Sequence, residues 1–311
     1  MEITGILKSI YIVTILVLST AGSEKAYQQN LAYTVEERGE ISGQLAMAWE
    51  MPQIEGSPYV LMRPDSSEQV YLRFIQAETR GNYEPMKTLG WNAIEILVQD
   101  PDALAKSLDK SQFEIIGAPA FLTEQQNIRA MQALGPDQEV LYLTRVIDPG
   151  ATDFILASAT SYVDRVFIMV LGTGDIGATS AWYSEWLGQA ISGPWPYKVG
   201  VLSTAWNRPV DTVYDLSIAQ LQESFLIEID EYPASAVKRS PALAGLPFGP
   251  AMVSFKVDSL ASVAEKLGKQ PQKIAAAPYS GRSVLLIQGP SGEWIELIGP
   301  ESKVDSMQAG Q

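Results

Sequence analysis

Short stretches in which apolar and polar residues alternate recur along the chain, each after a turn signal. GPDQEVLYLTRV (Gly135 to Val146) and GPSGEWIELIGP (Gly289 to Pro300) both begin with Gly-Pro and continue as an alternating strand. RPDSSEQVYLRF (Arg63 to Phe74) repeats this pattern, and QESFLIEIDEYP (Gln222 to Pro233) is a looser copy. A turn followed by such alternation is typical of a β-strand, and its recurrence indicates an internally repeated architecture.

Each of these closing strands follows an apolar strand and a helix that lie about 40 to 60 residues earlier, the length of one supersecondary repeat. The predicted opening strands are Ile3 to Val17, Gly90 to Val98, Val163 to Leu171 and Gly249 to Val257. The predicted helices are Ser23–Leu31, Pro101–Leu108, Ala178–Leu187 and Leu260–Leu267, with Asp100 and Ser259 as N-terminal caps. Each unit reads as a βαβββ module, so the chain consists of four modules of the α+β class.

A turn at Asp148-Pro-Gly separates the second module from the third. We therefore expect two domains, residues 1–150 and 160–311, each built by pairing its own two modules. The expected ligand cup lies in the C-terminal domain, and the N-terminal domain is expected to be degenerate.

The first residues allow two interpretations. Met1 to Ser23 has one lysine, an apolar run from Ile10 to Leu18 and small residues after it, as in a secretory signal peptide. The same run is rich in Ile, Val and Thr, as in a buried strand, and the repeat needs a strand there. We favour the strand and a cytoplasmic protein; a signal peptide would make the protein secreted or periplasmic.

Composition restricts the chemistry more than it restricts the fold. The net charge of −14 argues against nucleic-acid and anionic-membrane partners. The 311 residues include no histidine and no cysteine, which excludes His/Cys zinc sites, Ser-His-Asp triads and cysteine nucleophiles. Any catalysis must come from carboxylates, Tyr, Lys, Arg, Asn or backbone groups.

The modules resemble those of the vicinal oxygen chelate superfamily, which includes glyoxalase I, extradiol dioxygenases and bleomycin-binding proteins. Two segments carry the resemblance. LLIQGPSGEWIEL (Leu285 to Leu297) is similar to the closing hairpin of the family, and the third module, from VDRVFIMV to WYSEWLG, is similar to its opening strand and helix. The resemblance implies cup-shaped mixed sheets, each formed by two paired modules.

The resemblance also implies where a metal would lie, because opening strands commonly present His and closing strands Glu to the cup. The closing positions map to Glu228 and Glu296 in the C-terminal half and to Tyr71 and Tyr142 in the other half. The opening position of the third module maps to Arg165. The other opening positions map near Tyr11 or Ile12, Asn92 or Ala93, and Ala251 or Met252. We expect no cofactor, since two carboxylates beside an arginine bind metal weakly; Mg²⁺ or Mn²⁺ on Glu228 and Glu296 is the alternative.

These residues favour a metal-independent lyase or isomerase that acts on a small aromatic or carbonyl-bearing molecule. Glu228 and Glu296 would transfer protons, and Arg165 would stabilise negative charge. The expected substrate-binding residues are Trp206, Asn207, Tyr279, Arg282 and Met252. Two alternatives remain: a small-molecule binding protein of the bleomycin-resistance type, and a divalent-metal enzyme with a two-glutamate site. A further interpretation is that Glu228, Glu296 and Arg165 form only a structural ion network. A homodimer is possible, although the cup does not need one.

Overall fold

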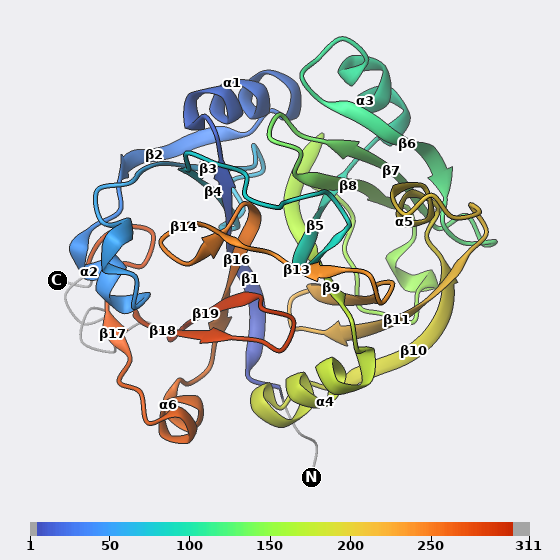
Figure 1. The fold of residues 1–311 in the computed structure, drawn as a ribbon. Helices are drawn as coiled ribbons and strands as arrows, with labels where there is room; N and C mark the ends of the chain where they lie inside the picture. The colour runs from blue at the N-terminus through green and yellow to red at the C-terminus, as the bar shows by residue number, and fades with distance from the viewer. Residues whose placement is uncertain (1–4, 301–311) are drawn as a thin grey trace, which may run out of the picture.

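The computed structural model describes residues 5–300, which form four βαβββ modules as expected (Figure 1). The predicted strand starting at Ile3 begins at Leu7, and Ile3 itself lies outside the described residues. Module 1 contains β1 (Leu7–Val17), α1 (Thr20–Leu31), β2 (Thr34–Glu40), β3 (Pro58–Arg63) and β4 (Tyr71–Gln76), with α2 (Gly43–Ala48) and η1 (Pro52–Ile54) between β2 and β3. Module 2 contains β5 (Thr88–Val98), α3 (Pro101–Leu108), β6 (Glu114–Phe121), β7 (Ile128–Leu134) and β8 (Val140–Val146).

The second half repeats this order after η2 (Pro149–Ala151). Module 3 contains β9 (Val163–Thr173), α4 (Ile176–Leu187), β10 (Ile191–Lys198), α5 (Gly200–Ala205), β11 (Val213–Gln220) and β12 (Leu226–Glu231). A connection with β13 (Val237–Lys238), β14 (Pro241–Leu243) and β15 (Leu246–Pro247) leads to module 4, which contains β16 (Gly249–Val257), α6 (Ala261–Leu267), β17 (Gln272–Lys273), β18 (Ser283–Gln288) and β19 (Trp294–Ile298). No helix between residues 5 and 300 is long and apolar enough to span a membrane.

The modules pair differently from the expected arrangement, in which each half of the chain closes on itself. Modules 1 and 4 form an eight-stranded sheet in the order β17-β18-β19-β16-β1-β4-β3-β2. Modules 2 and 3 form a nine-stranded sheet, β10-β11-β12-β9-β5-β8-β7-β6, which lies beside the first (Figure 1). Each sheet therefore contains residues from both predicted domains. The repeat pattern is the same for either pairing, because every opening strand offers an equivalent apolar edge; only long-range packing selects the partner.

Apolar side chains on one face of both sheets form a common core with the helices, including Val13, Phe74, Ile94, Ile227 and Phe255. Local signals fix the ends of several helices. Asp100 and Asp175 accept hydrogen bonds from the backbone N–H groups of Ala103 and Ala178, which caps α3 and α4. The other, concave face of each sheet forms a cup. We call the concave side of the eight-stranded sheet cup one and that of the nine-stranded sheet cup two.

Two equivalent hydrogen bonds join the sheets at the Gly-Pro turns. Tyr27 of α1 donates to the buried Glu139 (2.9 Å), and Tyr183 of α4 donates to the buried Glu293 (3.1 Å). The turn glycines are required there, since a Cβ at Gly135 would overlap the Glu139 carboxylate. Thus the Gly-Pro-x-x-Glu pattern that revealed the repeat also forms the contact between sheets.

Candidate active site

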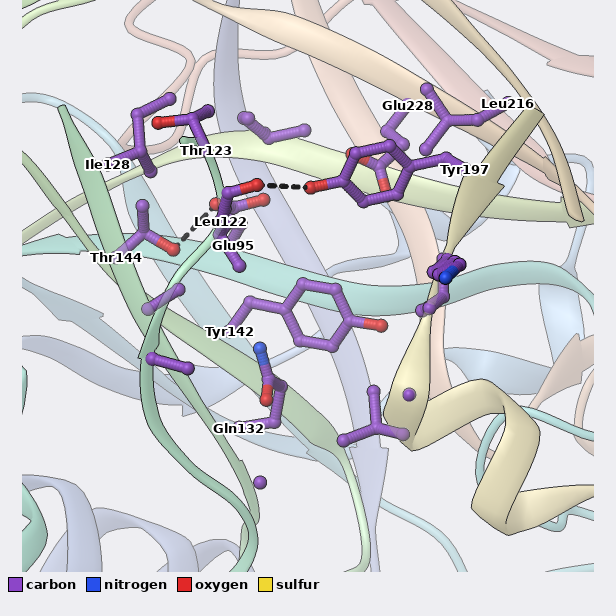
Figure 2. A pocket seen from close by; sticks show the side chains of 18 of the residues that line it. Glu95, Leu122, Thr123, Ile128, Gln132, Tyr142, Thr144, Tyr197, Leu216 and Glu228 are labelled. Carbon is purple, nitrogen blue, oxygen red and sulfur yellow. Dashed lines mark hydrogen bonds between the residues drawn. The ribbon is translucent and has the colours of Figure 1, made fainter. Parts of the chain in front are cut away.

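Cup two contains a cavity of about 840 Å³ between the sheet and the segments that overhang its edges. Its walls are mostly apolar and include Phe154, Leu156, Trp195, Leu216 and Ile218. Polar groups gather on the sheet itself, where strands β5, β8 and β12 contribute Glu95, Tyr142 and Glu228 (Figure 2). The cup therefore has an apolar wall and a floor with two carboxyl groups.

The two glutamates on this floor influence each other. Glu95 is buried and accepts a hydrogen bond from the Thr144 hydroxyl at 2.6 Å. Burial, and then the neighbouring Glu228, raise the pKa of Glu95 to about 8. Burial also raises the pKa of Glu228, to about 7. Because neither carboxyl is paired with a cationic side chain, the pair holds about one proton at neutral pH.

A third carboxyl group, that of Asp230, is hydrogen-bonded to Glu228. Asp230 is buried two positions after Glu228 on the same strand, and burial together with Glu228 raises its pKa well above the ordinary value. The hydrogen bond between Asp230 and Glu228 partly offsets the effect of burial on the pKa of Glu228. Burial also raises the pKa of Tyr142, followed by the effects of Asp230, Tyr232 and both glutamates, so the phenol of Tyr142 keeps its proton.

One hydrogen bond crosses the opening of cup two. The Tyr197 hydroxyl on β10 donates to the backbone carbonyl of Leu122 at 2.9 Å (Figure 2). Leu122 directly follows β6, and β6 and β10 are the two edges of the nine-stranded sheet. Tyr197 thus connects both edges of the sheet over the floor that carries Glu95 and Glu228.

Cup one, by contrast, is filled by side chains. Arg73 and Glu296 are 1% and 0% exposed, and Tyr279 lies between them. Arg73 donates to the Tyr279 hydroxyl (3.0 Å), which in turn donates to Glu296 (3.0 Å). Glu296 also accepts from the Trp49 indole (2.6 Å) and the Ser254 hydroxyl (2.5 Å). Arg73, Tyr279 and Glu296 thus form a buried hydrogen-bonded cluster, in which Nε and Nη1 of Arg73 have no hydrogen-bond partner.

The structure separates the three residues predicted to be catalytic. Glu228 lies in cup two and Glu296 in cup one, because their modules belong to different sheets. The expected proton-transfer pair and the alternative two-glutamate metal site are therefore both wrong as pairs. Arg165 lies beside neither: it packs over the Phe225 ring, donates to the Glu223 carbonyl (3.2 Å) and faces Glu68 (3.7 Å).

The predicted binding residues are divided in the same way. Met252 and Tyr279 are buried in the interior of cup one, and Arg282 donates to the Pro278 and Tyr279 carbonyls there. Trp206 is near cup two, but its indole donates to the Met86 carbonyl (2.9 Å) and it does not line the cavity. Asn207 is exposed. None of these five residues lines the cavity of cup two.

Sequence reasoning missed Glu95 because it placed the opening-strand positions too early. Strand register puts Glu95 opposite Tyr142 and Val170 opposite Glu228 in cup two. In cup one, Ser254 lies opposite Glu296 and Thr14 opposite Arg73. Thr14, Glu95 and Val170 lie six residues before the first residue of the following helix, and Ser254 lies seven before α6, whose N-cap is Leu260 and not the predicted Ser259. Counting back five residues from Ser19, Asp100, Asp175 and Ser259 finds every one of them. Arg165 lies five residues before Val170, and Tyr71 lies two before Arg73.

The donor set does not fit a resident divalent metal of the kind this type of cup commonly holds. Among residues 5–300, no three acidic side chains are arranged around one point as ligands. Asp230, the nearest third carboxyl, is hydrogen-bonded to Glu228, and burial raises its pKa, which disfavours the anionic form that a metal ligand needs. The floor of cup two instead holds two carboxyl groups with raised pKa values.

No protein-family model and no curated protein sequence matches the chain. Among solved structures, glyoxalase I from Zea mays is similar at a TM-score of 0.59 and 12% identity, covering 97% of this chain and 94% of that one. A Bacillus subtilis protein provisionally named a dioxygenase is similar at a TM-score of 0.60 and 8% identity, covering 96% and 87%. Identities this low show the fold alone. They confirm the fold predicted from the sequence: the chain has a four-module, two-cup fold similar to that of glyoxalase I.

Proposed function

We propose that the protein is an enzyme, a lyase or isomerase, that moves a proton within a small carbonyl-bearing molecule held in cup two. One observation carries the proposal: two carboxyl groups with raised pKa values lie together on the floor of an apolar cavity. A general base and a general acid work best when their pKa values lie near the operating pH. Glu228 and Glu95 meet this condition with pKa values of about 7 and about 8.

One glutamate acts as the base and the other as the acid, because the two lie together on the floor and both pKa values are raised. We assign the base to Glu228, whose carboxylate removes a hydrogen from the carbon next to the carbonyl. The electron pair of the C–H bond forms a C=C bond, while protonated Glu95 donates its proton to the carbonyl oxygen and gives an enol. If the proton returns to a different carbon, the molecule is isomerised. If a leaving group departs from the adjacent carbon, the reaction is an elimination. Thr144 orients Glu95 through its 2.6 Å hydrogen bond.

Hydrogen–deuterium exchange tests this first step without knowledge of the natural substrate. The probes are 1-tetralone and 1-indanone in D₂O, and mass spectrometry measures deuterium at the carbon next to the carbonyl. We expect exchange with the protein at least about 100-fold above buffer, and losses of about 10²-fold or more for Glu228→Gln and Glu95→Gln. Glu185→Gln is the control, since Glu185 forms an exposed ion pair with Lys266 far from the cavity. Ketones that bind but exchange no faster than in buffer would contradict the proposal.

A second candidate function is capture of an aromatic cation without turnover. The observation that favours it is the combination of unpaired carboxyl groups with Trp195 and Tyr197 in the same cavity, since aromatic faces and carboxylates both attract cations. Equilibrium dialysis with 1-naphthylmethylamine distinguishes the two. Tight binding of the amine, together with no ketone exchange, would favour capture over catalysis.

A further inference from the structure

The charges that line cup two are distributed unevenly. Three carboxyl groups (Glu95, Glu228 and Asp153) line the cavity, and Lys198 is the one cation among the described lining residues. Lys198 is exposed at the end of β10, and Asp153 is exposed as well. The deep end therefore holds only acidic and neutral groups: Glu95, Glu228, Tyr142, Thr144 and Gln132 (Figure 2).

The outer part of the cavity has the opposite character. Leu122, Trp195, Tyr197 and Val210 line it and remain exposed, and Val210 is 71% exposed. Exposed apolar residues gathered around a cavity indicate that an apolar molecule passes through or rests there.

We propose that cup two selects molecules that have an apolar part the size of a ring system and an uncharged polar group, which lies at the deep end of the cavity. Cup two rejects the corresponding molecules in which that polar group is a carboxylate. This inference specifies the substrate class of the proposed function and rests on the same site. An uncharged carbonyl or ester oxygen accepts a proton or hydrogen bond from the carboxyl pair. A carboxylate in the same place would meet buried acidic groups with no cation to offset them, which is a strong basis for discrimination. Arg165, the residue expected to hold a negative oxygen, lies elsewhere.

A matched pair of probes tests the inference by binding alone. Methyl 2-naphthoate and 2-naphthoate share one ring system and differ in the charge of the group at one end. Isothermal titration calorimetry at pH 8 measures both. We expect the ester to bind at least about tenfold more tightly than the carboxylate, since like charges placed together in a buried site cost considerable free energy.

Two variants show whether the carboxyl pair causes the discrimination. In the double variant Glu95→Gln/Glu228→Gln, the floor is neutral, and we expect the preference for the ester to fall to about threefold or less. The control is Asp215→Asn, which removes one negative charge from an exposed position on β11 outside the cavity and should keep the wild-type preference. Circular dichroism establishes that each variant is folded before binding is measured.

The outcomes separate this inference from the proposed function. Equal affinity for the two probes in the wild-type protein, or no binding of the ester up to its solubility limit, overturns the inference. An unchanged preference in the folded double variant overturns it as well. If the ester is preferred but ketones show no exchange, the proposed chemistry fails and the inference about charge selection stands.

Discussion

The two cups have the same strand order and differ in what occupies them. In cup one, Arg73 and Glu296 stand at equivalent strand positions to Glu228 and Tyr142 of cup two. The cation in cup one lies within a closed hydrogen-bonded cluster that contains the carboxylate. In cup two a carboxyl replaces the cation, and Glu95 adds a second one. The first cup has balanced charges and is closed, whereas the second has an unbalanced charge and an open cavity.

A short helix in each odd-numbered module accentuates this difference. Helix α2 ends at Trp49 and helix α5 at Trp206, and in both cases the backbone N–H of the tryptophan closes the helix in the same way. The Trp49 indole donates to Glu296 and fills cup one. The Trp206 indole donates to the Met86 carbonyl and leaves cup two open. Two copies of one local structure thus have opposite effects on the space inside the two cups.

The largest expected effect concerns the balanced cup. Arg73 is linked to Glu296 through the Tyr279 hydroxyl. Replacing Arg73 with Met leaves the buried Glu296 without this cation, and removing one charge from a buried set of opposite charges costs about 3–5 kcal/mol. We therefore expect the free energy of unfolding to fall by about this amount in urea denaturation. The double variant Arg73→Met/Glu296→Gln should recover part of the loss. If Arg73→Met has no effect on stability, cup one is not held together by this cluster.

The same kind of substitution in cup two should act in the opposite direction. Because the pKa of Glu95 is raised to about 8 in the fold, its contribution to stability is present below its ordinary pKa and is lost as the pH rises through about 8. The Glu95→Gln variant has no carboxyl group at this position, so it does not lose stability in this way as the pH rises. We expect the variant to be more stable than the wild type at pH 8.5 by at least about 1 kcal/mol, or about 2–4 °C in melting temperature, and to show no such gain at pH 5.

The titratable groups around Glu95 also have raised pKa values, so their effect on stability has the same sign as that of Glu95. Glu228 and Asp230 also have raised pKa values, Tyr142 stays protonated, and Thr144 does not titrate. A sign control is Glu24→Gln: the hydrogen bond from Arg38 lowers the pKa of Glu24, so this variant should lose a little stability at pH 8.5. A melting temperature of Glu95→Gln that is equal to or below that of the wild type at pH 8.5 would show that Glu95 is not held in a destabilised charged state.

The smallest expected effect concerns the opening of cup two. Tyr197→Phe keeps the ring and removes the hydrogen bond to the Leu122 carbonyl. Since a net hydrogen bond contributes about 0.5–1.5 kcal/mol and Tyr197 is 41% exposed, we expect a stability change below about 1 kcal/mol. We expect methyl 2-naphthoate to dissociate faster by a few-fold in stopped-flow measurements. An unchanged dissociation rate would mean that the bond across the opening does not restrict passage.

The sequence predicted the modules well because their signals are local. The closing strands at Val140–Val146 and Trp294–Ile298 follow their Gly-Pro turns, and α3 occupies the predicted residues behind Asp100. The strand interpretation of the first residues is confirmed by β1, which lies in the middle of a sheet between β16 and β4. Periodicity, turns and caps act over a few residues, so a single sequence shows them directly.

The candidate site was predicted only in part, because it depends on pairing between distant strands. Glu228 was found from its place on a closing strand, and it does line the cavity. Its expected partner, Glu296, belongs to the other sheet, and its actual neighbour, Glu95, is far away in sequence, on β5. Glu95 and Glu228 come together only because module 2 pairs with module 3 through β5 and β9.

The sequence by itself determined four βαβββ modules, an acidic chain and chemistry without histidine or cysteine. Only the tertiary structure decided that modules 1 and 4 and modules 2 and 3 are partners, that cup one is filled, and that two carboxyl groups meet in cup two. The reason is physical. Local patterns fix elements through the backbone and its nearest neighbours, whereas the pKa of a carboxyl group depends on burial and on charges brought close by the whole fold.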